Sequence, residues 1–180
     1  LGGLLQSFGM TRELAGIDDL NQLPPDDLLE VVAASRARKE LLAATPIGTR
    51  SVTQVVYYTK EGDNAALRRA LAETGLRIED FDPTNSMATR PTNAVWHGRD
   101  VPFEHFKLVA LSLMRAKVAL QRFGPTCVNT ELKKNRIEVG ASVQAAGLPL
   151  ATADQLADDD ADDGEQDREA DHREHERLGQ

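Results

Sequence analysis

Residues 52–81 read VTQVVYYTKEGDNAALRRALAETGLRIEDF, and this stretch decides the fold class. Residues 52–59 are mainly β-branched or aromatic, which is typical of a β-strand. Gly62-Asp63-Asn64 then matches a helix start, and the alanines and leucines that follow share one side of a helix that Gly75 ends. Residues 76–81 predict a second strand. The stretch is therefore a strand, a helix and a strand.

The same order of elements returns further along the chain. After a polar loop over residues 83–91, residues 92–98 (TNAVWHG) predict a third strand. Asp100 is expected to cap the next helix, with Pro102 in its first turn. The apolar residues of this helix cover more than one stripe, so we expect the helix to be deeply buried.

Two further segments complete the predicted sheet. Residues 118–123 predict a fourth strand, and residues 136–139 are a candidate for a fifth. The order β-α-β-β-α-β over residues 52–123 is that of the ferredoxin-like split βαβ pattern, in which two helices cover one face of an antiparallel sheet. We therefore predict an α+β fold of this ferredoxin-like kind, with the fifth strand as an addition.

Composition divides the chain into three parts. Residues 1–48 are predicted to be a helical N-terminal region, residues 49–142 the α+β domain, and residues 143–180 an acidic, solvated tail without fixed structure. Within the first part, Ser35 interrupts the apolar pattern of residues 11–45. One bent helix and two short helices fit this pattern equally well.

The acidic balance of the chain belongs to its C-terminal end. The 180 residues have a formal net charge of −8, yet residues 151–180 contain 12 acidic and three basic residues, which leaves the rest close to neutral. Like charges and few apolar residues keep such a segment in solvent. We expect truncation after Leu150 to leave thermal stability nearly unchanged. A near-neutral body also lacks the broad basic surface that binding to a phosphate backbone needs.

Cysteine content and hydropathy favour a cytoplasmic location. Cys127 is the single cysteine and has no partner for a disulfide within the chain. No apolar run reaches the roughly 18–20 residues needed to cross a bilayer. The opening residues 1–5 lack the basic flank of a signal peptide. The chain does not begin with Met, so a processed product and an excerpt of a longer polypeptide are both open.

No catalytic or cofactor motif is present in the sequence. There is neither a Gly-x-Ser-x-Gly motif nor a glycine-rich phosphate loop. His97 and His105 lack metal-site spacing, and Cys127 has no neighbours that would lower its pKa. We therefore expect no enzymatic activity, no cofactor and no metal.

A small set of residues is a candidate for binding a partner or ligand: Tyr58, Arg90, Trp96, His97 and Asp100. RNA-recognition domains share the predicted element order and stack bases on aromatic residues of their first and third strands. The third strand here lacks their basic and aromatic signature, so we expect no nucleic-acid partner. Packing of these aromatic residues in the core, or under the N-terminal helices, is the competing interpretation.

Residues 92–102 (TNAVWHGRDVP), together with the helix predicted over 103–116, resemble small α/β modules appended to bacterial multidomain signalling and defence proteins. The resemblance covers about residues 52–123. Such proteins can carry caspase-like or TIR effector domains. The resemblance therefore implies an accessory module that senses, positions or recruits, while catalysis takes place elsewhere. No effector motif is present, so no catalytic residue is carried over.

Three hypotheses for function follow. The first is a non-catalytic regulatory or interaction module of a bacterial signalling or defence system, which binds a protein partner, a fused effector domain or a ligand through its small sheet. The second is a small ligand-binding or enzymatic domain with a pocket near Trp96, His97, Asp100 and His105. The third is a structural subunit of a larger assembly.

Overall fold

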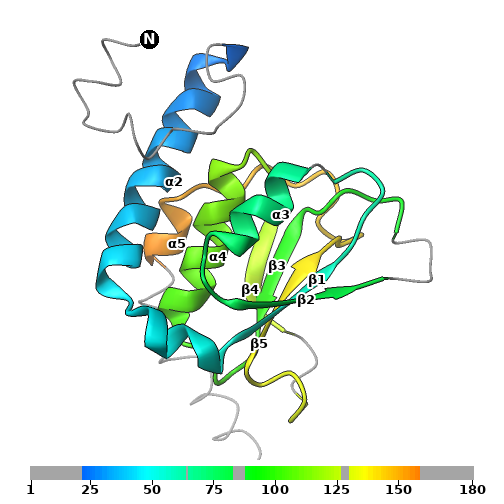
Figure 1. Ribbon diagram of the computed structural model, residues 1–180. Coiled ribbons are helices and arrows are strands. Elements are labelled where there is room, and N and C mark those ends of the chain that lie inside the picture. Colours follow the sequence, from blue (N-terminus) through cyan, green and yellow to red (C-terminus); the bar gives the residue numbers. More distant parts are fainter. Residues whose placement is uncertain (1–21, 64, 83–87, 127–129, 159–180) are drawn as a thin grey trace, which may run out of the picture.

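The computed structural model describes residues 22–63, 65–82, 88–126 and 130–158 (Figure 1). The elements in chain order are α2 (Pro25–Ala44), the 3-10 helix η2 (Ile47–Val52), β1 (Gln54–Tyr58), α3 (Ala65–Ala72), β2 (Arg77–Phe81), β3 (Ala94–His97), α4 (Phe103–Arg115), β4 (Arg122–Pro125), β5 (Arg136–Gly140) and α5 (Gln155–Asp158).

The strands form a single mixed sheet in the order β2-β1-β5-β3-β4. β1 pairs in parallel with β2 and with β5, β3 pairs in parallel with β4, and β3 and β5 are antiparallel. The α+β class is therefore confirmed. The ferredoxin-like order is not, because each pair of helix-linked strands is directly hydrogen bonded instead of having another strand inserted between its members.

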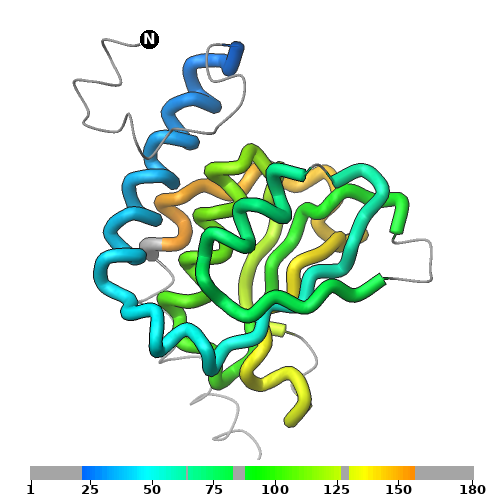
Figure 2. Tube along the Cα trace, in the orientation of Figure 1, coloured from blue at the N-terminus to red at the C-terminus, as the bar shows by residue number. Residues whose placement is uncertain are grey.

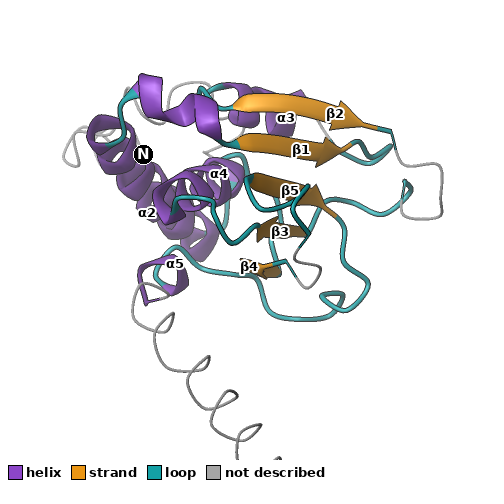
Figure 3. Cartoon of the chain, turned by 90° about the horizontal axis from the view of Figure 1, so that it is seen from below, coloured by secondary structure: helices purple, strands orange, loops and turns teal. Residues whose placement is uncertain are grey.

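Two strand–helix–strand units make up most of the fold. The first is β1-α3-β2 and the second is β3-α4-β4. The strands of the first unit are antiparallel to those of the second. In each unit the second strand, β2 or β4, lies at an edge of the sheet. A right-handed crossover, the strong preference of such units, then places both helices on the same face. Figures 1 and 3 show α3 and α4 on one side of the sheet, with α2 beyond α4.

β5 occupies the centre of the sheet although it is the last strand in the chain. Its residues Ile137 and Val139 are fully buried on the helix side. Two apolar residues in alternation predict only a short strand with one buried side. The central position follows from pairing with β1 on one side and β3 on the other, and both strands lie far away in the sequence.

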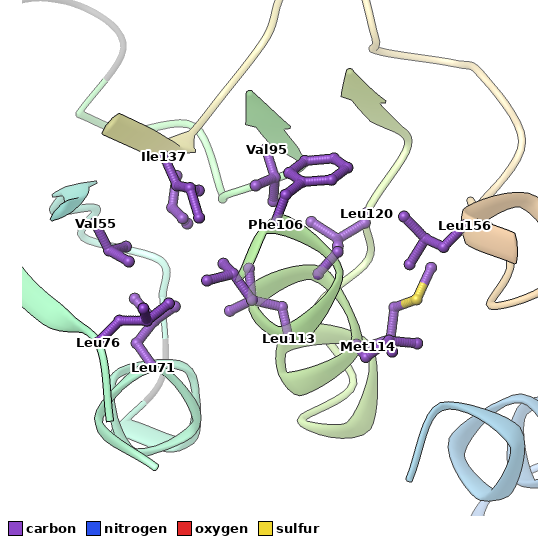
Figure 4. Close-up of a cluster of buried hydrophobic side chains, with 14 of the residues drawn as sticks. Val55, Leu71, Leu76, Val95, Phe106, Leu113, Met114, Leu120, Ile137 and Leu156 are labelled. Carbon is purple, nitrogen blue, oxygen red and sulfur yellow. The ribbon is translucent and has the colours of Figure 1, made fainter. Parts of the chain in front are cut away.

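The core lies between the sheet and the helices (Figure 4). Val55, Val95 and Ile137 point from β1, β3 and β5 into one layer. They meet Leu71 of α3 and Leu113 of α4, which are both fully buried. Burial of side chains of this size contributes about 1.5–3 kcal/mol each, which makes this layer the main source of stability.

α4 is buried on two sides, as its apolar residues predicted. It packs on the sheet with one side and on α2 with the other. α2 is one continuous helix through Ser35, so the alternative of two short helices is wrong. The small side chains of Ala34 and Ser35 are buried and allow the two helices to approach closely. Arg38 of α2 also donates a hydrogen bond to Ser112 Oγ of α4 at 2.8 Å.

Asp100 does not cap α4, contrary to expectation. Pro102 occupies the N-cap position, and no side chain accepts a hydrogen bond there. The Asp100 carboxylate instead faces two cations, with Oδ1 3.6 Å from Arg99 Nε and Oδ2 4.0 Å from Lys134 Nζ. Its backbone N–H donates to the carbonyl oxygen of Lys134 at 2.9 Å. This bond ties the turn between β3 and α4 to the segment that leads into β5.

Residues 151–156 return to the core, so the expectation of a solvated segment does not hold for them. Leu156 is 1% exposed and lies near Met114 in Figure 4. The backbone N–H of Ala153 donates to the Glu30 carboxylate, which places the segment beside α2 (Figure 2). Ala145, also within the predicted tail of residues 143–180, is fully buried. The part of this tail from residue 159 onward lies outside the described residues.

Truncation after Leu150 should destabilise the fold, because it removes Ala153 and Leu156 from the core. We expect the free energy of unfolding in urea to fall by at least about 2 kcal/mol, the contribution of one buried leucine. A chain truncated after Asp158 keeps both residues and should unfold at the same urea concentration as the full chain. Equal midpoints for the two truncated chains would contradict the docking of residues 151–156.

Gly98→Ala should destabilise the fold severely. A Cβ atom at Gly98 would lie 2.0 Å from the carbonyl oxygen of Lys133 and 2.5 Å from that of Lys134, and neither backbone atom can move without shifting β5. We expect a loss of about 3 kcal/mol or more in urea unfolding. Gly48→Ala is the matched control: a Cβ there meets nothing within 4 Å, so stability should stay unchanged or rise by up to about 1 kcal/mol. Similar midpoints for the two variants would argue against the close approach of Gly98 to the backbone of Lys133 and Lys134.

Candidate functional site

One face of the sheet points away from α3 and α4, and we call it the open face. Its central residues Val56, Ala94 and Glu138 are nevertheless buried, whereas Tyr58 and Trp96 are half-buried. Side chains alternate between the two faces of a strand, and residues paired in register share a face. The register therefore places Val56, Glu138 and Trp96 in one row across β1, β5 and β3. A second pair on the same face, Tyr58 and Phe81, lies at the ends of β1 and β2. This open face is the candidate functional site, and Figure 3 shows the helices on the opposite side.

Glu138 is the residue of the open face that both Tyr58 and Lys133 bind. It lies on the middle strand and is 8% exposed. The Tyr58 hydroxyl donates a hydrogen bond to Glu138 Oε1 at 2.8 Å. The Lys133 ammonium lies 2.9 Å from Oε1 and 3.0 Å from Oε2. A buried carboxylate is costly unless its oxygens are paired, and these two donors pair it.

Gly140 makes room for the tyrosine in this arrangement. A Cβ atom at Gly140 would lie 3.3 Å from the Tyr58 ring, so the ring lies across the glycine and its hydroxyl reaches Glu138 on the same strand. Burial, and then the hydrogen bond to Glu138, raise the pKa of Tyr58 to about 12. The phenol therefore remains protonated at neutral pH and acts as a donor.

Tyr58 and Trp96 share the open face but do not lie on adjacent strands. β5 runs between β1 and β3, and each strand spacing is about 4.8 Å, so the two aromatic strands are about 10 Å apart. The Glu138 carboxylate occupies the space between them. A negative charge at this place is unfavourable for the phosphates of a stacked nucleic acid.

Phe81 extends the aromatic surface to the edge of the sheet. Its ring centroid lies 5.3 Å from that of Tyr58 in an edge-to-face arrangement, and the residue is 52% exposed. β2 is the outermost strand here, and its charged residues Arg77, Glu79 and Asp80 are exposed. Charges on an edge strand oppose indiscriminate pairing with other strands. The exposed aromatic surface is thus on the face rather than along the edge.

The two predicted histidines lie on the helix side of the sheet or within a helix. The His97 ring is 4.6 Å from the Phe106 ring and 6.2 Å from the Phe103 ring, measured between centroids. His105 is buried in α4, and its Nδ1 lies 2.7 Å from Thr53 Oγ1. Burial lowers the pKa of His105, which favours the neutral imidazole. Both histidines therefore pack against the core instead of facing a partner.

The structure does not bring the residues of the second hypothesis into one pocket. Trp96 belongs to the open face, His97 points to α4, His105 is buried in that helix, and Asp100 lies in the turn after β3. Arg90 lies before the opposite end of β3 and lines a cavity of about 470 Å³. Of the sequence candidates, Tyr58 and Trp96 are the two that share the open face.

The described residues contain neither a group of metal ligands nor a membrane-spanning helix. There, no three His, Cys, Asp or Glu side chains are grouped closely enough to hold an ion. Among the same residues, no helix combines the length and the apolar character needed to cross a bilayer. Cys127 lies outside the described residues.

Glu138 and Lys133 are central to the open face, although the sequence analysis named neither as a site residue. The signal for Glu138 is its position between Ile137 and Val139, which makes it the single charged residue between two buried apolar ones. Lys133 has no such local signal. It lies outside β5, and only the fold shows that its ammonium reaches Glu138.

Comparisons with protein-family models, with curated proteins and with solved structures find no match to this chain.

Tyr58→Phe should destabilise the protein, because it removes one of the two donors to a buried carboxylate. A hydrogen bond to a charged group contributes about 1.5–3 kcal/mol, and we expect a loss in this range in urea unfolding. In a Glu138→Gln background the acceptor is neutral, so Tyr58→Phe should cost about 1 kcal/mol. The same cost in both backgrounds would show that Tyr58 does not stabilise the Glu138 charge.

Proposed function

We propose that this protein is a non-catalytic interaction module that binds a protein partner, or an effector domain fused to it, through the open face. The observation that carries the proposal is that Phe81, Tyr58, Glu138 and Trp96 share the face of the sheet opposite α3 and α4. The rest of this subsection treats these four residues and Lys133 as the binding surface.

The chemistry of the open face suits recognition of a protein. Interface centres are enriched in tyrosine, tryptophan, phenylalanine and arginine, and a few such residues carry most of the binding energy. Here Phe81 offers exposed apolar area, and Arg77, Arg122 and Arg136 share the face by register. A flat sheet with rigid aromatic side chains requires little ordering when a partner binds.

The Tyr58–Glu138–Lys133 cluster would give the surface its specificity. Tyr58 and Lys133 both bind the Glu138 carboxylate, so the three side chains are already oriented before a partner binds. A partner that covers the cluster must match a fixed pattern of charge and hydrogen-bonding groups, and a mismatch would leave a buried group unpaired. The same cluster supports a protein partner over a nucleic acid, because Glu138 lies between the two aromatic residues.

A regulatory role in bacterial signalling or defence belongs to the proposal and is supported by the resemblance of residues 92–116 to accessory modules. In that setting the partner carries the catalytic activity, and this chain either positions the partner or senses a signal for it. The competing role of a structural subunit predicts a fixed stoichiometry with its partner, which native mass spectrometry of the complex measures.

Photo-crosslinking from the open face tests the proposal. The photoreactive residue p-benzoylphenylalanine is introduced in the cell in place of Phe81, and in a separate chain in place of Leu29, which is 62% exposed on α2. We expect crosslinks to a defined protein from position 81 and not from position 29. That protein is then purified, and its Kd for the wild-type chain is measured by calorimetry.

The binding measurement decides the outcome. Loss of an interface anchor costs more than 1 kcal/mol, so Phe81→Ala should weaken binding of the purified partner by at least about 5-fold. Leu29→Ala should change the Kd by less than about twofold. Equal effects of the two substitutions, or crosslinks from both positions to the same proteins, would refute the open face as the binding surface.

A further inference from the structure

A cavity of about 470 Å³, lined by apolar residues together with several polar and charged ones, lies at one end of the sheet, away from the Tyr58–Glu138–Lys133 cluster. It forms where β1 and β5 end and where β3 and β4 begin, next to the end of α4. The volume falls within the range of about 300–1,000 Å³ that small-molecule sites occupy. In open α/β sheets, ligands often bind in a crevice outside the carboxyl ends of the strands, at the point where the strand order reverses.

Lys117 lines this cavity in an unusual backbone conformation. Its φ is +62°, and within the described residues it is the one non-glycine residue with positive φ. The Lys117 N–H donates to the Met114 carbonyl at 2.9 Å, and the Val118 N–H donates to the Leu113 carbonyl at 3.0 Å. These two bonds are the helix-ending motif in which glycine is the usual residue at this position. A lysine here therefore accepts backbone strain that a glycine would avoid.

The charged groups of the cavity favour an anion. Arg90 and Lys117 line it with exposed side chains. Asp63 is the acidic residue of the lining, and it already accepts bonds from the Tyr57 hydroxyl at 2.8 Å and from the N–H and hydroxyl of Thr92. The lining therefore carries two cationic side chains against one carboxylate, and that carboxylate is already engaged by protein donors.

The amide side chains of the lining hold the cavity in shape. Asn93 Nδ2 donates to Gln121 Oε1 at 3.0 Å and to the Ser142 carbonyl at 3.2 Å, while its Oδ1 accepts from the Ser142 N–H at 2.7 Å. Gln121 Nε2 donates to the Leu148 carbonyl at 2.8 Å. The bonds join the start of β3, the approach to β4 and the segment after β5, so the walls are built before a ligand arrives.

We propose that this cavity binds a small molecule through an anionic group, a carboxylate or a phosphate, which Arg90 and Lys117 hold together. This site is separate from the open face, and its ligand is distinct from the protein partner proposed above.

Amide chemical-shift mapping of the full chain tests the site. Inorganic phosphate and acetate are titrated in separate arms at constant ionic strength, and the two arms distinguish phosphate from carboxylate recognition. We expect saturable shifts in at least one arm at cavity residues such as Gly62, Asn93, Ser142 and Gly147. Shifts that do not saturate, or that spread evenly over basic surface residues, would overturn the proposal.

Lys117→Gly separates a role in binding from a role in folding. Glycine relieves the strain at this position, so the melting temperature should rise by about 2–4 °C. Binding of the anion should nevertheless weaken by at least about tenfold, as it should for Arg90→Ala. Arg36→Ala is the charge-matched control, because Arg36 is exposed on α2 and pairs with Glu40. Unchanged affinity in Lys117→Gly, or an equal loss in Arg36→Ala, would overturn the assignment.

Discussion

The position of β5 between β1 and β3 is the constraint on which the rest of the fold depends. The strands of the two strand–helix–strand units do not pair with each other, and each unit joins the sheet of the other only through β5. These pairings are distant in sequence, so they carry a large loop-closure entropy that the buried Ile137 and Val139 must offset. Because Gly98 has no side chain, the turn after β3 can lie directly against the backbone of Lys133 and Lys134, which leads into β5.

The same central strand creates the open-face cluster. Once β5 lies between β1 and β3, alternation directs Glu138 away from the helices and toward Tyr58 and Trp96. The Tyr58 hydroxyl and the Lys133 ammonium then satisfy a carboxylate that burial alone would disfavour. The core and the open-face cluster therefore both depend on β5: Ile137 and Val139 face the helices, and Glu138 between them carries charge on the opposite face.

Much of the local structure was predictable, and the errors have physical causes. The segment from Val52 to Phe81 is a strand, a helix and a strand, and the helix after Pro102 is deeply buried, as the residue patterns predicted. The strand order differs from the predicted ferredoxin-like order, because hydrophobic alternation shows which face of a strand is buried but not which strand it pairs with. Leu156 was assigned to a solvated segment because one apolar residue among acidic ones gives no sign that it packs into the core. On the open face, the sequence named Tyr58 and Trp96 as candidates for binding, but it named neither Glu138 nor Lys133.

The sequence by itself determined the α+β class, the strand, helix and strand between Val52 and Phe81, and the deep burial of the helix after Pro102. Those properties depend on alternation, helical periodicity and turn residues, which act over a few positions. Only the tertiary structure decided that β1 and β3 flank β5, that Tyr58 reaches Glu138, and that Lys117 lies at a cavity with Arg90. Each of these relations joins residues that are distant in the chain, and their free energies arise from packing and pairing across the folded molecule.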